Sequence, residues 1–202
     1  MAEARRNSVQ QLAELYNVVI GVALSIAIYN SVDASARPLP IKSTTIINVA
    51  TFITIIVPFY HGAVRHLFAT YVEEGGSKRI KNGALLADFF LLFLEGCLFV
   101  MLASVLTEPV TFGWVLVALL VFDSVWGFLA GLAFTGAQAQ HAERTWALIN
   151  VVTAALLSVC LILFEPMFVS KPLLSEAGLF VIIALRTIVD YVLCWNFYFP
   201  EG

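Results

Sequence analysis

The chain has 202 residues, of which 60% are hydrophobic and 12% are charged, and its formal net charge at pH 7 is −3. Soluble globular domains average about 45–50% apolar and about 25% charged residues, so this composition excludes an ordinary soluble domain. The hydrophilic stretches are too short for a further soluble domain. We therefore expect a protein that works inside the lipid bilayer.

Six apolar runs are long enough to cross a bilayer, which takes about 20 residues. They lie at 13–33, 44–72, 84–107, 109–134, 144–168 and 174–198. Arg5 and Arg6 before the first run resemble the start of a signal peptide, but we expect this run to be retained as a span. The sequence therefore predicts one all-α domain over residues 1–202, a polytopic membrane protein with six transmembrane helices.

The distribution of Lys and Arg over the links predicts the orientation of these helices. With both ends inside, the inner side holds Arg5, Arg6, Lys78, Arg79, Lys81 and Arg144, against Arg37, Lys42 and Lys171 outside. The outer turns would then hold Pro38, Pro40, Pro109, Pro166 and Pro172. We predict an N-in and C-in multi-pass protein of a cell membrane, with the bacterial inner membrane as the expected one.

The first span carries small and polar residues at every fourth position, which places them on one helix face. These residues are Asn17, Gly21, Ser25 and Tyr29. One interpretation is a seam of small residues that lets two helices pack closely. The other is a pore wall with an apolar constriction, lined by Val18, Val22, Ser25 and Tyr29.

The second span ends in the polar segment 58–68, and ionisable groups at this depth need partners or water. Pro58 is expected to kink the helix just before this segment. His61 and His66 are five residues apart, about 140° around a helix, so they do not converge on one metal ion. We expect no metal site, and we interpret Cys97, Cys160 and Cys194 as small apolar residues.

The later spans supply acids and one more arginine. Arg186 and Asp190 are four residues apart and can pair within one helix. Counting from the helix ends predicts a buried polar hub near the cytoplasmic side, made of Asn17, Arg65, His66 and Asp88. It also predicts a layer of midplane charges, made of Glu95, Asp123, Arg186 and Asp190. Because the acids are in excess, a histidine is protonated, an acid is neutral, or water enters. Glu95 is either a neutral hydrogen-bonding group or a cation or proton site.

Three segments of the chain resemble the bacterial TMEM175-like potassium channel family, whose members are six-helix chains of about this length. The segments are 15–25, 60–68 with Tyr60-His61 and Arg65-His66-Leu67-Phe68, and 85–94 with Asp88. Leu15-Tyr16-Asn17 stands where the family has Phe-Ser-Asp. The resemblance implies a tetramer around a central pore lined by the first helix, with Val22 at the constriction. It also implies monovalent cations as the permeant species.

Four classes of function remain open from the sequence. The first is an oligomeric, potassium-like cation channel or channel-like pore, without a carbonyl filter because no Thr-Val-Gly-Tyr-Gly run exists. The second is a noncatalytic accessory or effector subunit, and the third is a small proton-coupled transporter that uses Glu95, Asp123 and Arg186. A membrane enzyme would have to use His61 or His66 with Asp88, and we expect no enzyme. The expected partners are the lipid bilayer and further copies of the chain, with no nucleic acid and no cofactor.

Overall fold

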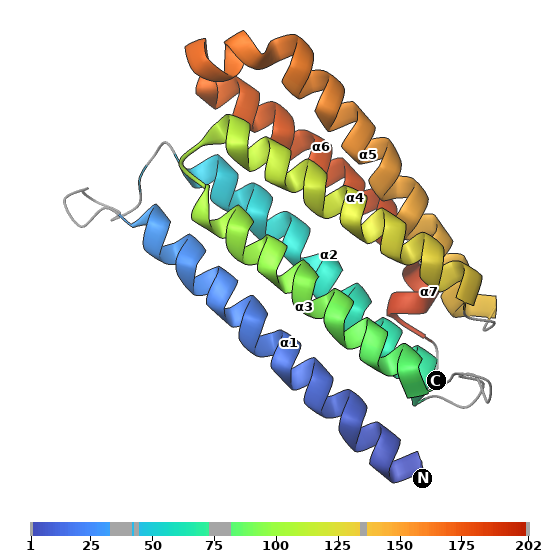
Figure 1. Cartoon of the computed structure of the whole chain (residues 1–202). Helices are drawn as coiled ribbons and strands as arrows, with labels where there is room; N and C mark the ends of the chain where they lie inside the picture. Colours follow the sequence, from blue (N-terminus) through green and yellow to red (C-terminus); the bar gives the residue numbers. More distant parts are fainter. Residues whose placement is uncertain (1, 33–41, 43–44, 73–81, 134–136, 201–202) are drawn as a thin grey trace.

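A computed structural model describes residues 2–32, 42, 45–72, 82–133 and 137–200, and these residues form an all-helical bundle (Figure 1). The helices are α1 (Ala2–Ser31), α2 (Ile46–Tyr71), α3 (Asn82–Ser104), α4 (Pro109–Ala133), α5 (Ala137–Ser170), α6 (Pro172–Leu193) and α7 (Trp195–Tyr198). The six long helices are each long and apolar enough to cross a membrane. The protein is therefore a polytopic membrane protein, as the sequence predicts.

The helix ends differ from the prediction at several points. α1 begins at Ala2, because the polar residues before the first apolar run continue the same helix. The predicted last span is divided into α6 and the short α7. Pro166 was expected to end a helix at an outer turn, but it lies inside α5, where Phe164 has non-helical backbone angles. Proline disrupts the preceding helical turn, which explains why α5 bends there rather than ends. Pro38, Pro40 and most of the basic link 73–83 lie outside the described residues.

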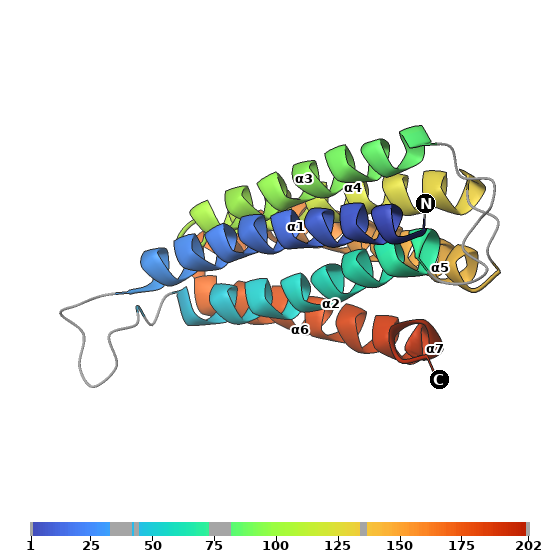
Figure 2. The same cartoon turned by 90° about the horizontal axis from the view of Figure 1, so that it is seen from below.

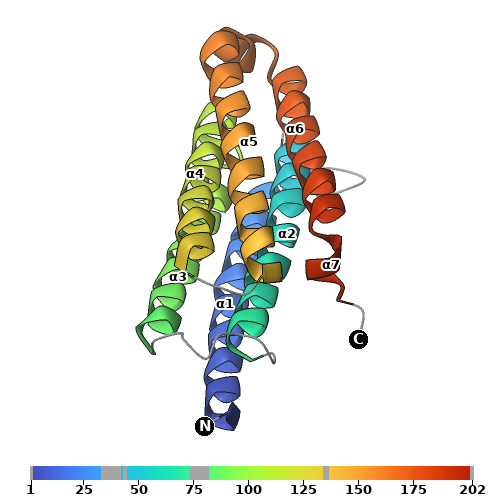
Figure 3. The same cartoon turned by 90° about the vertical axis from the view of Figure 1, so that its right-hand side faces the viewer.

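The six long helices follow one another around the bundle in the order α1, α3, α4, α5, α6 and α2, and α2 returns to contact α1. α4 and α5 share the most extensive contact. α1 lies at the edge of the bundle (Figure 1), where it runs between α2 and α3 (Figure 2). Both chain ends lie at the same end of the bundle (Figures 1 and 3). Which side of the membrane this end faces stays a prediction.

The aromatic core lies in one half of the interior, and apart from Glu176, which contacts Asn48 in that half, the buried charged residues lie outside it. Away from the chain ends, the rings of Phe52 and Phe59 meet Phe99 edge to face, with centroids 6.3 and 5.6 Å apart. Fully buried leucines of α3, α4 and α5 surround them: Leu102, Leu116, Leu119, Leu120 and Leu157. Most buried charged residues lie instead toward the chain ends, among them His66, Asp88 and Glu143. This division sets the place of the candidate site.

Glycines allow close contact between helices at two points near the polar half. A Cβ atom at Gly96 of α3 would overlap the side chain of Val19 on α1. A Cβ atom at Gly127 of α4 would lie 3.0 Å from the backbone oxygen of Glu143 on α5. Small residues at such contacts let membrane helices approach closely. The second contact fixes the position of Glu143 against α4.

Candidate functional site

The first polar cluster, called the His66 cluster below, joins α2, α3 and α5 through His66, Tyr71, Asp88 and Glu143. His66 Nε2 lies 3.2 Å from Asp88 Oδ2, and His66 Nδ1 lies 2.7 Å from Glu143 Oε1. The Tyr71 hydroxyl donates a hydrogen bond to Asp88 Oδ2 over 2.5 Å. All four side chains are buried. The histidine is thus held between two carboxylates from different helices.

The contacts of His66 indicate which protonation state of its imidazole ring the site accommodates. A neutral imidazole donates from one nitrogen only, whereas a protonated ring donates from both. Both nitrogens of His66 face carboxylate oxygens, so the protonated ring satisfies both contacts. The ring of Trp126 on α4 meets the imidazole edge to face, with centroids 5.9 Å apart.

The second polar cluster, called the Arg186 cluster below, joins α4, α5, α6 and α7. Arg186 Nη1 donates to Asp190 Oδ2 over 2.8 Å, the pair within one helix that the sequence predicts. Arg186 Nε donates to Asn150 Oδ1 over 2.9 Å, and Asn150 Nδ2 donates to Asp123 Oδ2 over 2.5 Å. The Tyr198 hydroxyl donates to Asp190, 3.1 Å from Oδ1. The guanidinium also lies over the ring of Phe59, 4.9 Å from its centroid. One arginine therefore connects acids of two helices.

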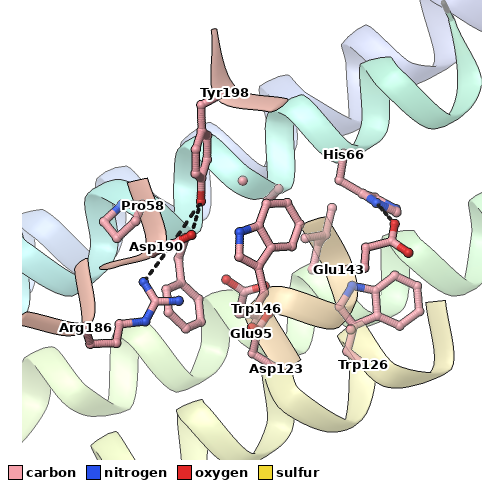
Figure 4. Close-up of a pocket in the computed structure, with 15 residues that line it drawn as sticks. Pro58, His66, Glu95, Asp123, Trp126, Glu143, Trp146, Arg186, Asp190 and Tyr198 are labelled. Carbon is pink, nitrogen blue, oxygen red and sulfur yellow. Dashed lines mark hydrogen bonds and ion pairs between the residues drawn. The ribbon is translucent and has the colours of Figure 1, made fainter. Parts of the chain in front are cut away.

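A cavity of about 30 Å³ lies between the two clusters (Figure 4). It is enclosed by α2, α3, α4, α5, α6 and α7, while α1 lies outside its wall. Its ionisable lining residues are His66, Glu95, Asp123, Glu143, Arg186 and Asp190. A water molecule in a protein needs at least about 10–15 Å³ of such space together with polar partners. The cavity therefore has room and partners for about two waters.

Glu95 connects this cavity to α1. It is buried on the same face of α3 as Asp88, and its Oε1 accepts a hydrogen bond of 2.9 Å from the Tyr16 hydroxyl. The Tyr16 ring stacks on Tyr60 of α2, with centroids 6.1 Å apart and an interplanar angle of 7°. Because Glu95 lies near the middle of α3, Tyr16 marks the middle of the bundle along α1.

The structure brings together only some of the residues of the predicted hub. The structure brings His66 and Asp88 together, but it places Asn17 on the exposed face of α1. Asn17 also follows Tyr16, so it lies at the depth of Glu95 and not near the cytoplasmic surface. Arg65 is partly buried and turns toward α7, where its Nε donates to the Phe197 carbonyl oxygen over 2.8 Å. The prediction of Asn17 as a buried member of the hub is therefore wrong for the single chain.

The residues of the predicted pore wall lie on the outer face of α1. Val18, Val22, Ser25 and Tyr29 are exposed, as are Asn17 and Gly21. A Cβ atom at Gly21 would meet nothing within 4 Å, so within one chain this face is not a packing seam. Glu14 is exposed one turn before Val18 and accepts a hydrogen bond from Gln10 over 3.1 Å. The outer face of α1 is polar around the depth of Glu95 and more apolar beyond it.

Tyr198, the last residue of α7, lines the cavity at one side. Cys194 lies directly after α6 and is buried, and burial together with the nearby Asp190 raises the pKa of its thiol to about 12. Burial and Asp190 also raise the pKa of the Tyr198 hydroxyl. Both groups therefore stay protonated at neutral pH. His61 packs on this segment, its ring 4.7 Å from that of Tyr198, and so belongs to a different contact from His66.

Several members of the two clusters were not predicted from the sequence, above all Glu143 and Asn150. The predicted span began at 144, so Glu143 was placed outside the membrane. These two residues are seven apart and share a face of α5, a spacing that would have indicated a second polar stripe. Among the described residues, no group of three or more His, Cys, Asp or Glu side chains is arranged so that it could hold a metal ion.

Comparison with known proteins adds no relative: the chain matches no protein-family model, no curated protein and no solved structure. The resemblance to the TMEM175-like channels rests on the sequence motifs alone.

Proposed function

We propose that copies of this chain assemble around a water-filled path lined by the outer face of α1, and that the assembly conducts small cations such as potassium. The motif resemblance supports four copies. The apolar stretch with Val18 and Val22 would form the narrow neck of the path. No curated or structural relative carries this proposal, which is argued from the geometry of α1.

The observation that carries the proposal is the exposure of Asn17 at the depth of the bundle's middle. Tyr16 reaches Glu95 in the middle of α3, so its neighbour Asn17 lies at hydrocarbon depth. An exposed amide in hydrocarbon costs several kcal/mol, on the order of 4–8 on alkane scales. Water or a second copy of the chain removes this cost.

Glu14 strengthens the argument and indicates the sign of the permeant ion. It is exposed about half a turn from Tyr16 and on the same outer face as Asn17. A charged group at this depth facing lipid is expensive, whereas rings of carboxylates line the paths of cation channels. Assembly around α1 would place one such carboxylate per copy along the path. Val18 and Val22 follow as an apolar constriction that gates by excluding water.

The experiment is current recording from the purified protein in planar bilayers, under opposed potassium and sodium gradients. Val22→Asn should wet the neck and increase the unitary current or change the selectivity. Val57→Asn is the matched control, because Val22 is 48% and Val57 is 50% exposed, but Val57 lies on α2.

Currents that change in Val22→Asn and not in Val57→Asn would support a path lined by α1. Equal changes in both variants would contradict it, because they would indicate a general effect of a polar residue. No current from wild type or Val22→Asn at either voltage sign would overturn the proposal and favour an accessory subunit.

A further inference from the structure

The cavity between the His66 and Arg186 clusters contains more acid than base. Four carboxyl groups line it, from Glu95, Asp123, Glu143 and Asp190. The lining bases are His66 and Arg186. Arg186 binds Asp190 directly, and His66 lies between Glu143 and Asp88. Among the described residues, neither Glu95 nor Asp123 therefore forms an ion pair with a cation.

The carboxylate of Glu143 independently indicates that a hydrogen-bond donor occupies the cavity. Its side chain is 2% exposed, and its Oε2 is buried with no hydrogen-bond partner among the described residues. Its other oxygen, Oε1, faces His66. Leaving a buried acceptor without a donor costs about 1–3 kcal/mol, more for a charged group. The adjoining cavity has room for a water that would supply that donor.

The size and shape of the site favour protons over a metal ion as the bound charge. Calcium takes six to eight oxygen ligands, and magnesium needs a near-octahedral set. Within the described part of the chain, no group of three or more His, Cys, Asp or Glu side chains is arranged to hold a metal ion, and the cavity has room for about two waters only. Buried carboxylates without a cation are neutralised at lowest cost by binding a proton.

We propose that this cavity is a proton-binding site, which holds water and in which protons shared between the Glu95 and Asp123 carboxyl groups neutralise the excess negative charge. The groups that face the site come from every helix around it. The lining groups are His66 of α2, Glu95 of α3, Asp123 of α4, Glu143 of α5, Arg186 and Asp190 of α6, and Tyr198 of α7. Behind them, Tyr16 of α1 contacts Glu95, and Asp88 of α3 contacts His66. The site does not depend on conduction along α1.

The test is infrared difference spectroscopy on the full chain in lipid vesicles, in H₂O and D₂O, between about pH 6, where exposed carboxyl groups with pKa values near 4 are already ionised, and alkaline pH. Wild type should lose a protonated-carboxyl band as the pH rises, and the band should shift in D₂O because water reaches the site. Asp123→Asn and Glu95→Gln should each lower the amplitude of this band by about half. Glu165→Gln is the control, because Glu165 is exposed near the bend of α5, and it should leave the band unchanged.

Two results would overturn the proposal. One is a band of full amplitude in both Asp123→Asn and Glu95→Gln. The other is a wild-type protein whose protonated-carboxyl signal is absent or does not shift in D₂O. Wild type alone decides the second point, so the test does not depend on the folding of either variant. Bilayer currents are a separate readout, and their absence would leave this result unaffected.

Discussion

Polar side chains are mostly buried and paired in the interior between α2 and α6, whereas they are exposed on the outer face of α1. In the interior, Arg186 contacts Asn150 of one neighbouring helix and Asp190 of its own, and His66 contacts acids of two other helices. On α1, Glu14 and Asn17 are exposed, although Tyr16 between them reaches Glu95. In the interior, most polar side chains find partners within one chain. On the outer face of α1 they stay exposed in the single chain, and in the proposed assembly water or another copy would contact them.

The largest expected effect is on the interior, in Arg186→Met. Removing the guanidinium leaves Asn150 Oδ1 without its donor and leaves Asp190 without its cation, with only the Tyr198 hydroxyl still donating to it. Breaking a buried pair in this way costs about 3–5 kcal/mol. Thermal unfolding in detergent measures the loss. Arg186→Lys should give a smaller loss, because an ammonium group cannot reproduce the two directed contacts of the guanidinium. Lys171→Met, at an exposed position, is the control. Equal stability of Arg186→Met and wild type would contradict the description of this region as a tightly paired interior.

An intermediate and different effect is expected on the outer face of α1, in Asn17→Leu. An exposed substitution changes the unfolding free energy of the chain by about 0.5 kcal/mol or less. Conduction should nevertheless fall, because leucine makes the path apolar at this depth. Cation flux into vesicles and thermal unfolding, measured on the same preparation, separate the two effects. Flux equal to that of wild type would show that this face of α1 does not line the path.

The smallest expected effect is on the reactivity of the Cys194 thiol, which tests where the buried interior ends. The thiolate is the reactive form, and a pKa of about 12 keeps this thiol protonated, whereas an ordinary thiol has a pKa of about 8.5. At pH 9 the folded protein should react slowly with a disulfide reagent, the denatured protein should react fast, and the folded rate should rise toward pH 12. Cys97 and Cys160 are replaced by alanine to isolate the signal. Similar rates at pH 9 in the folded and denatured protein would show that the buried region ends before Cys194.

The raised pKa of Cys194 also makes the unfolding free energy depend on pH. The folded state holds the Cys194 proton more tightly than the unfolded state, so ionisation of the unfolded chain lowers the unfolding free energy as the pH rises above about 8.5.

The sequence predicts the six spans because hydrocarbon thickness fixes both their length and their apolar character. It also predicts the Arg186–Asp190 pair, because residues four apart on a helix are neighbours. Contacts between helices cannot be predicted from local spacing in this way. Glu143 meets His66 only after α5 has packed beside α2, and no local spacing encodes that. The place of Asn17 was missed for a related reason. Successive residues on a helix are about 100° apart, so Tyr16 faces the interior while its neighbour Asn17 faces outward. An error of one position in the assigned face is enough to misplace Asn17.

The contacts of Asp123 have a consequence for how the protein is made. Asp123 enters the membrane with α4, but its partner Asn150 belongs to α5 and Arg186 to α6, both of which are synthesised later. During synthesis α4 therefore carries an acid whose hydrogen-bond donor, Asn150, does not yet exist, and an acid at that depth is expensive in lipid. We expect α4 to remain beside the insertion machinery, or to enter with Asp123 protonated, until α5 supplies this donor and α6 supplies the arginine that holds it. A chain that stops before α5 would leave Asp123 without its donor and would be a substrate for membrane quality control.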